Sequence, residues 1–445
     1  MHDDENVIIC FLVCYHAFRR SDWRGRRGTQ AVLPPMGQER GSAPDGGEFV
    51  TARNKMTLIQ PIFAGILAST VGFASTFAVV LQGFATVGAS PEQAASGLFA
   101  LCLAMGLLGI GLSFVTRMPI AIAWSTPGAV LLISTGAVEG GFAAATGAFI
   151  GAAVLMVVSG LWRPFGRAVA AIPMPLAAAM LAGILFELCL APVKAVAELP
   201  LLALPVVLVW IVLLRVARLW AVPAAVLVAA IAIAMTSDLP PDVFSGAFPT
   251  PVWVTPVITI DAMIGIALPL FVVTMASQNI PGLAVLRSNG YDPEPAPIFV
   301  SISVASGLGA LIGGHMINLA AITAALCAGP DAHPDVKKRY IAAIAGGMFY
   351  VALAFGAGVA AAFVAVAPAI LIEAVAGLAL IGSLAAALQG AVANEEFRLS
   401  AVVTFLTVAS GLTLFGIGAA FWGLVAGGAV HMLLAYKGKK ERDGR

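Results

Sequence analysis

Long apolar stretches separated by short polar breaks run through the chain from Leu58 onward, and this pattern predicts membrane-spanning helices. A helix needs about 20 apolar residues to cross the hydrocarbon layer of a bilayer. We predict fourteen spans, at residues 60–83, 93–115, 119–133, 142–161, 171–190, 199–214, 219–235, 262–285, 298–313, 316–328, 341–365, 369–390, 399–417 and 419–436. The third and tenth are too short for a full helix, so we expect broken spans there. The predicted fold is an all-α polytopic membrane protein.

The composition strengthens this interpretation. Of 445 residues, 60% are hydrophobic, and the charges comprise 24 Lys and Arg and 23 Asp and Glu. Twenty-two of these charges lie in residues 1–55 and 437–445, which leaves 25 for residues 56–436. Soluble domains carry about 25% charged residues, so a soluble globular enzyme is excluded. A net charge of +1 gives no electrostatic footprint for nucleic acid, so we expect no such partner, and the expected surroundings are a lipid bilayer.

The distribution of basic residues predicts the orientation. If the amino terminus is cytoplasmic, ten of the eleven basic residues between Met56 and Tyr436 fall in cytoplasmic loops. Only Lys194 falls in an outer loop. Because cytoplasmic loops are enriched in Lys and Arg, we expect both termini to be cytoplasmic, with residues 437–445 as a basic cytoplasmic tail.

Residues 1–55 differ from the remainder of the chain. The apolar run at 7–15 is too short to span a membrane, and the following segment is charged and rich in Gly and Pro, which predicts disorder. The sequence from Met56 onward is typical of the beginning of a membrane protein. Residues 1–55 are therefore a candidate for an extension that results from a start codon assigned too far upstream. The five cysteines are scattered, and we expect neither disulfides, a metal nor a cofactor.

Two features suggest an internal duplication. Pro61–Phe63 followed by Ala68 and Ser69 recurs 208 residues later as Pro269–Phe271 followed by Ala276 and Ser277, and the two short spans are seven apart. Because seven is an odd number of spans, the second copy of such a repeat enters the membrane from the side opposite to the first. We therefore predict inverted repeats at residues 56–235 and 236–436. In inverted-repeat carriers the substrate binds near the midplane, where half-helix amino termini attract anions.

The two short spans carry candidate substrate-binding residues. In the third span, Pro127 favours an extended Ser125–Thr126 and a half-helix with Thr126 as its cap, which brings Gly128 to the start of that helix. The alternative is an ordinary proline kink. In the tenth span, His315 and Asn318 precede the second half-helix; the alternative for His315 is an inert position at the outer mouth.

The eighth span carries Ser277, Gln278 and Asn279 in succession, which is costly at membrane depth unless the groups are paired or face a cavity. The alternative is interhelical hydrogen bonding, worth only about 0.6 kcal/mol on average. In the first span, Ser75 and Thr76 lie midway and are further candidates, although small hydroxyl residues also serve packing.

Proton carriers are harder to assign. Glu187 and Glu373 are the carboxylates that fall inside apolar runs, and intramembrane acids are functional candidates by default. Both lie near the outer ends of their spans, where exposure at the interface also explains them. His315 and the protonated substrate itself remain alternatives.

Four motifs, WSTPGA at 124–129, IPMPLAAAMLAGILF at 172–186, TMASQNIPGLAVLRSNGY at 274–291 and INLAAITAAL at 317–326, give a direct resemblance. The chain resembles the bacterial benzoate membrane transport family, the benzoate/proton symporters, from about Pro61 to the last span. These are related to nucleobase/ascorbate carriers and sulfate permeases. The resemblance implies a core domain (spans 1–4 and 8–11), a gate domain (spans 5–7 and 12–14), and a ligand between antiparallel extended segments of spans 3 and 10.

The resemblance also implies the function: import of benzoate or a similar aromatic carboxylate with a proton across the bacterial inner membrane, by alternating access. Nucleobase carriers have acids in spans 8 and 10, and their absence here favours an anionic substrate. We expect the carboxylate to accept from N–H groups near Gly128 and Asn318, and the ring to lie near Phe77 and Met275. A homodimer is a candidate assembly. The alternatives are a passive anion channel or a carrier for another small organic anion; an enzyme would need motifs such as HExxH or GxSxG, which are absent.

Overall fold

The computed structural model describes residues 46–162, 173–236, 249–320, 322–414 and 418–443. The chain divides into two units, Met1–Thr51 and Ala52–Arg445. Of the first unit only residues 46–51 are described, as the start of a helix. Most of the expected amino-terminal extension, residues 1–45, lies outside the described residues, whereas residues 46–55 are helical.

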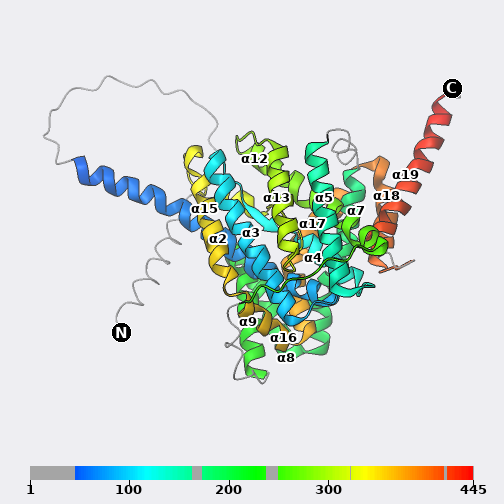
Figure 1. Cartoon of the computed structure of the whole chain (residues 1–445), viewed down its shortest axis with the longest axis horizontal. Coiled ribbons are helices and arrows are strands. Elements are labelled where there is room, and N and C mark those ends of the chain that lie inside the picture. Colours follow the sequence, from blue (N-terminus) through cyan, green and yellow to red (C-terminus); the bar gives the residue numbers. More distant parts are fainter. Residues whose placement is uncertain (1–45, 163–172, 237–248, 321, 415–417, 444–445) are drawn as a thin grey trace. The chain divides into compact units, whose positions relative to one another are not determined.

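Helices account for most of the described chain, and two three-residue strands interrupt them (Figure 1). The helices and strands used below are α2 (Gly46–Thr86), α3 (Pro91–Thr116), β1 (Ile122–Trp124), α4 (Thr126–Thr135), α5 (Gly141–Leu161), α7 (Met174–Glu198), α8 (Pro200–Val216), η1 (Arg218–Trp220), α9 (Ala221–Thr236), α10 (Ile260–Ala262), η2 (Met263–Ala267), α11 (Leu268–Thr274), η3 (Met275–Asn279), α12 (Ile280–Ser288), α13 (Pro295–Ala310), β2 (Ile317–Leu319), α14 (Ile322–Ala328), α15 (Tyr340–Ala354), α16 (Ala357–Val366), α17 (Ala369–Val392), η5 (Glu395–Phe397), α18 (Arg398–Ala409) and α19 (Ala419–Asp443). The expected tail at 437–445 is therefore helical as far as Asp443.

The lengths and apolar character of these helices establish a multi-pass membrane protein. Among the described residues, seven helices are long and apolar enough to cross a bilayer, or eight if the bent pair α15 and α16 forms one span. The helices at Thr126–Thr135, Pro200–Val216, Pro295–Ala310 and Ala419–Leu434 are apolar but shorter. The count of fourteen spans in an inverted repeat stays a prediction.

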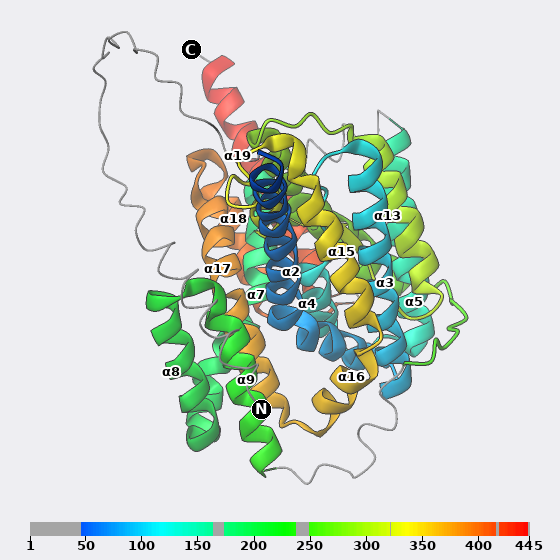
Figure 2. The ribbon, with the colours of Figure 1, turned by 90° about the vertical axis from the view of Figure 1, so that its left-hand side faces the viewer.

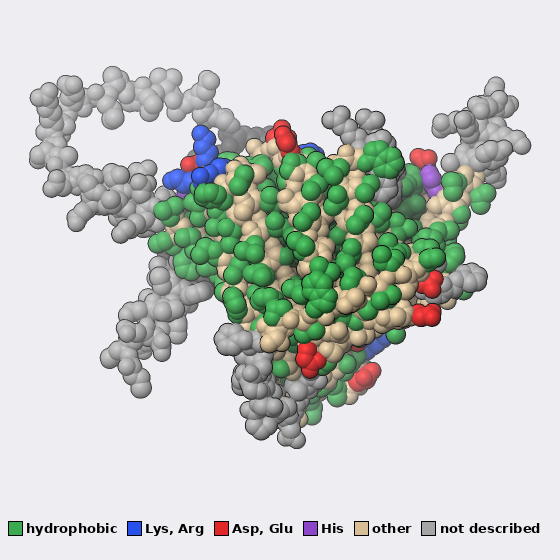
Figure 3. All heavy atoms as spheres, viewed as in Figure 1, with side chains coloured by type: hydrophobic (Ala, Val, Ile, Leu, Met, Phe, Trp, Pro, Cys, Tyr) green, Lys and Arg blue, Asp and Glu red, His purple; other side chains and the backbone are tan. Residues whose placement is uncertain are grey.

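The outer surface is apolar, as a lipid-facing surface must be. Large hydrophobic side chains are exposed on several helices, including Leu201, Leu227 and Met348. Figure 3 shows hydrophobic side chains over most of the visible face, with the charged side chains near its edges. Without a hydrophobic force between helices in lipid, packing must come from close contact of the helices themselves.

Glycine provides that close contact where α3 packs against α15. A Cβ at Gly106 would lie 2.6 Å from the carbonyl oxygen of Gly347, and one at Gly347 would lie 2.8 Å from that of Gly106. Other neighbouring pairs are α5 with α13, α7 with α17, and α18 with α19. In Figure 2, α8 and α9 lie together and away from α3, α5 and α13.

The two short spans are broken, which confirms that expectation. The strands β1 and β2 pair antiparallel, with Ala123 opposite Asn318. The N–H of Ser125 donates to the carbonyl oxygen of Met316 (2.9 Å), which extends the pairing beyond the strands. Helix α4 begins at Thr126, one residue earlier than predicted, and Pro127 lies in its first turn, where the missing N–H costs no hydrogen bond and the fixed φ suits a helix. Helix α14 follows β2.

The segment from Ile260 to Ser288 is helical but contains two π-turns, η2 and η3. Each is followed within two residues by a proline, Pro269 or Pro281, that has no N–H to donate. Such π-turns shift the angular positions of the residues that follow and occur often at functional sites. The run Ser277–Asn279 lies within η3.

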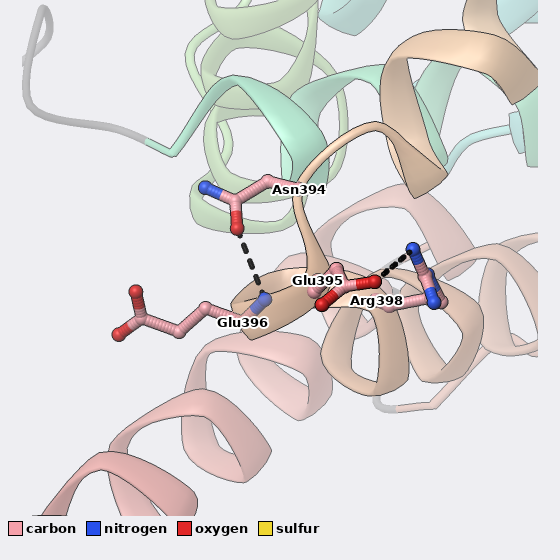
Figure 4. A network of polar contacts seen from close by, with 4 residues as sticks. All are labelled: Asn394, Glu395, Glu396 and Arg398. Atoms are coloured by element: carbon pink, nitrogen blue, oxygen red, sulfur yellow. Dashed lines mark hydrogen bonds and ion pairs between the residues drawn. The ribbon is translucent and has the colours of Figure 1, made fainter.

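A polar loop joins α17 to α18. The side-chain oxygen of Asn394 accepts from the N–H of Glu396 (3.0 Å) and caps the short helix η5, while Glu395 forms an ion pair with Arg398 at 3.4 Å (Figure 4). These side chains are exposed, so the loop marks one end of the membrane-embedded part of α17 and α18.

Candidate functional site

A cavity of about 110 Å³ lies beside the paired strands. Its walls come from α2, from β1 and the start of α4, from η3, from the start of α14 and from α15. Helices α7 and α17 supply the remaining wall. The volume is of the same order as the roughly 150 Å³ of an engineered apolar cavity that accommodates benzene.

The polar wall of the cavity is a cluster of hydroxyl groups centred on Thr76. The hydroxyl of Thr76 accepts from the indole N–H of Trp124 (2.9 Å) and from the hydroxyl of Thr126 (3.5 Å), and it donates to the carbonyl oxygen of Gly72 (3.2 Å). Ser75 also lines the cavity and donates to Gly72. The predicted residues Ser75 and Thr126 thus meet in one place, together with Thr76.

Ser125 and Gly128 lie behind this wall. The hydroxyl of Ser125 accepts from the N–H of Gly128 at 3.2 Å, so Ser125 and not the predicted Thr126 is the cap of α4. The same hydroxyl forms a hydrogen bond with Thr274 at 2.7 Å. Ser125 is completely buried. The N–H of Gly128 therefore already has an acceptor in this structure. The residues of α4 that border the cavity are Thr126 and Pro127.

The three consecutive polar residues of η3 have different partners. Gln278 lines the cavity. Ser277 donates to the carbonyl oxygen of Val273 in its own helix (2.5 Å). Asn279 is buried and accepts from the N–H of Leu319 (2.9 Å), so it joins η3 to β2. The π-turn presents one member of the run to the cavity and another to the strand.

His315 and Asn318 are both buried; Asn318 is the middle residue of β2, and His315 lies two residues before the strand. Asn318 lies opposite Ala123, which lines the cavity, and its Oδ1 has no hydrogen-bond partner among the described residues. His315 lies among the rings of Phe84 and Phe149, and its Nε2 likewise has no partner in the described part of the chain. Neither residue is part of the cavity lining.

The two acidic candidates differ in their surroundings. The side chain of Glu187 is 79% exposed and lies 3.8 Å from the ammonium of Lys194. Glu373 is half-buried and accepts from the side-chain amide of Gln82 at 2.7 Å. Neither carboxylate lines the cavity.

Trp124, Tyr350, Leu185 and Leu380 form most of the apolar wall. The rings of Trp124 and Tyr350 meet edge to face at 6.3 Å. The expected ring neighbours, Phe77 and Met275, are buried but do not line the cavity. Trp124 stands in the WSTPGA motif and could have been found there, whereas Tyr350 and Leu380 lie in uniformly apolar spans without any signal.

The cavity is therefore neutral and amphipathic. None of the described residues that line it carries a charge, and its polar groups are hydroxyls, one amide and backbone. Among the described residues, no group of three or more His, Cys, Asp or Glu could hold a metal ion. Such a lining suits a small molecule with an apolar body and one polar end.

Comparisons with known proteins identify the family of the chain. Residues 56–433 match the sequence family described as "Benzoate membrane transport protein". The inner membrane protein YdcO of Escherichia coli (strain K12) is 39% identical over 84% of this chain and 95% of its own length. The benzoate membrane transport protein of Acinetobacter baylyi (strain ATCC 33305 / BD413 / ADP1) is 33% identical over the same shares of the two chains.

The fold also occurs in solved structures of transporters. The murine Solute Carrier 26 family member A9 anion transporter, in its inward-facing state, gives a TM-score of 0.57 at 15% identity and covers 93% of this chain and 77% of its own. The transmembrane domain of the cyanobacterial bicarbonate transporter BicA gives 0.51 at 14% identity, over 85% of this chain and 97% of its own. The fold and the family are those of transporters and not of enzymes. The chain belongs to the benzoate membrane transport protein family.

Proposed function

We propose that the protein imports benzoate, or a similar aromatic carboxylate, together with a proton across the bacterial inner membrane by alternating access. The observation that carries this proposal is the neutral cavity between the hydroxyl cluster of Thr76 and the rings of Trp124 and Tyr350. The name of the Acinetobacter relative supports benzoate as the first substrate to test.

The carboxylate is recognised without a cationic side chain. Thr126 and Pro127 are the first residues of α4 and border the cavity. The amino terminus of a helix carries about half a positive charge, which favours an anion. The hydroxyls of Ser75, Thr76 and Thr126 donate to the carboxylate in place of the acceptors they have in this structure, and Gln278 adds a side-chain amide to the same lining. The other predicted site residues do not line the cavity, and their proposed role is to hold the lining residues in place: Ser125, Gly128, Ser277, Asn279, His315 and Asn318.

The aromatic ring lies on the apolar wall. Trp124 and Tyr350 offer ring faces and edges, and Leu185 and Leu380 complete the pocket from α7 and α17. Aromatic pairs in offset or edge-to-face contact gain about 0.5–1.5 kcal/mol beyond the burial of their area. This wall therefore favours an aromatic acid over an aliphatic acid of similar size.

Alternating access follows from the two sets of walls. In the proposed fourteen-span architecture, the strands, α2, η3 and α15 belong to the core domain, and α7 and α17 belong to the gate domain. The cavity then lies between the two domains, so movement of one past the other opens it to either side in turn. The repetition of a strand followed by a short helix, β1 with α4 and β2 with α14, supports the inverted repeat.

Uptake of radiolabelled benzoate into proteoliposomes tests the proposal. We expect accumulation that depends on an inward proton gradient and falls when unlabelled aromatic acids compete. A passive anion channel would instead give currents far above carrier rates and no accumulation. Competition by an aliphatic anion but not by benzoate would identify a carrier for another small organic anion. Size determination in detergent tests the expected homodimer.

A further inference from the structure

We infer that Gln82 and Glu373 form the proton-binding pair of this transporter, and that the pair closes one side of the cavity; the inference rests on the proposed proton-coupled transport. The side-chain amide of Gln82 in α2 donates to the carboxyl of Glu373 in α17 at 2.7 Å. The two residues are 291 positions apart in the chain. In the proposed architecture, this bond joins the core domain directly to the gate domain.

The hydrogen-bonding pattern indicates where the proton binds. The Oε1 of Gln82 is a buried acceptor with no partner among the described residues. An ionised carboxylate has only acceptors, whereas a protonated carboxyl also carries an O–H donor. A proton bound to Glu373 therefore lets its O–H donate to Oε1 of Gln82 while the amide N–H donates back. The pair then has two hydrogen bonds, and no buried acceptor is left over.

The position of the pair makes it suited to close the cavity. On α2, Gln82 lies six residues beyond Thr76, and on α17, Glu373 lies seven residues before Leu380. At 1.5 Å per residue, both separations correspond to about 10 Å along the helix. Thr76 and Leu380 line the cavity. The pair thus spans the interface of α2 and α17 beyond one end of the cavity, which is the outer end in the predicted orientation.

Other charged groups do not replace the proton at Glu373. The side chains of α2 from Leu58 to Thr86 include no titratable residue, and α9 has none. On α7, Lys194 lies 3.8 Å from the carboxylate of Glu187, and Cys189 donates to the carbonyl oxygen of Gly377, one turn from Glu373. The other charges on elements packed against α17 are Glu198 at the end of α7, Arg215 in the last turn of α8, and Glu395 and Arg398 after the end of α17; among the described residues, none of them forms an ion pair with Glu373.

Coupling follows from this arrangement. A proton from the outer water forms the O–H bond at Glu373, which completes the two-bond pair and holds the outer side closed. Release of that proton into the cavity, once the cavity is open to the cytoplasm, removes the O–H donor. Only the amide bond to the carboxylate then remains, the Oε1 of Gln82 is again without a partner, and the closure is weakened. Closure of the outer side around a bound substrate therefore requires one proton on Glu373, and each substrate molecule is imported together with one proton.

Three variants test the inference. Glu373→Gln keeps a hydrogen-bond donor and an acceptor at this position, but the amide cannot bind and release a proton. We therefore expect counterflow exchange of radiolabelled benzoate to continue, while accumulation driven by a proton gradient falls at least tenfold. The reciprocal swap, Gln82→Glu with Glu373→Gln, returns one acid to the pair and should restore gradient-driven accumulation. Glu198→Gln, an exposed carboxylate at the end of the adjacent helix, is the matched control and should accumulate benzoate as the wild type does.

The outcomes separate the inference from the proposed function. Gradient-driven accumulation by Glu373→Gln at the wild-type level, or a swap that fails to restore it while counterflow continues, overturns the pair. Absence of benzoate counterflow in the wild type overturns the proposed substrate instead. The pair is then decided by infrared spectra in acidic and alkaline buffer: a carboxylic-acid C=O band that is absent from Glu373→Gln supports it, and identical spectra refute it.

Discussion

The buried hydroxyl of Ser125 connects three parts of the molecule at the level of a single residue. It accepts from the N–H of Gly128, shares a hydrogen bond with Thr274, and follows β1 directly in the chain. Ser125 therefore contributes to stability in two ways. Its hydroxyl caps α4, and its removal would also leave the buried hydroxyl of Thr274 without this hydrogen bond.

Ser125→Ala should therefore destabilise the protein by about 1–3 kcal/mol. The expected readout is a lower midpoint of thermal unfolding for the purified protein in detergent. Ser134→Ala is the control, because Ser134 is exposed and bonds only within α4, to the carbonyl oxygen of Leu131. Equal midpoints for the two variants would contradict the role assigned to Ser125.

Trp124→Phe removes the N–H that donates to Thr76 but keeps an aromatic ring at the apolar wall. Without this N–H the hydroxyl of Thr76 is no longer held in place, and binding of the ligand must order it. At about 0.5–1.5 kcal/mol for one hydrogen bond, we expect about 2- to 10-fold weaker binding of benzoate with the protein still folded. Saturation of initial uptake rates measures the effect. Trp220→Phe, an exposed position in η1, should leave the half-saturating concentration unchanged.

Among the elements, the broken spans were the most predictable, for reasons that can be named. Pro127 has no N–H and suits the first turn of a helix, so its position in a short apolar stretch indicated a helix start close to it. The start itself was predicted one residue too late, because Thr126 is helical and Ser125 is the cap. The pairing of β1 with β2 could be expected only from the family resemblance, because two segments so distant in the chain share no local pattern.

The orientation of the helices about their axes was not predictable. Spans such as α15 and α17 are apolar on all sides, and a hydrophobic pattern without a polar face does not indicate which side chains meet a cavity. Tyr350 and Leu380 were missed for this reason. In η3 the π-turn changes the spacing of Ser277–Asn279, so only Gln278 reaches the cavity.

The contact of α3 with α15 gives a test at this scale. Gly106→Ala would bring a methyl group to 2.6 Å from the backbone of Gly347, so the helices must separate. Overpacking of this kind costs about 1–3 kcal/mol. The thermal midpoint in detergent should fall. On the same helix, Gly111→Ala meets nothing within 4 Å and should be neutral or slightly stabilising. The reverse order would show that α3 does not approach α15 closely.

For the whole molecule, the orientation in the membrane is the first property to test. Residues of the loop in Figure 4 should face the cytoplasm, and the end of α7 should face outward. In a variant without native cysteines, Glu396→Cys should react with a membrane-impermeant maleimide only after the cells are opened. Glu198→Cys should react in intact cells. The opposite labelling would reverse the proposed topology.

The division of the cavity wall between two sets of helices has an evolutionary consequence. The hydroxyls that we propose to face the carboxylate belong to α2 and α4, whereas α7 and α17 contribute Leu185, Leu380 and Ser383 to the cavity wall. Substitutions on the second set can enlarge or narrow the space for the ring without disturbing the hydroxyl cluster. Related carriers can therefore diversify in the ring substituents they accept while they continue to handle carboxylic acids.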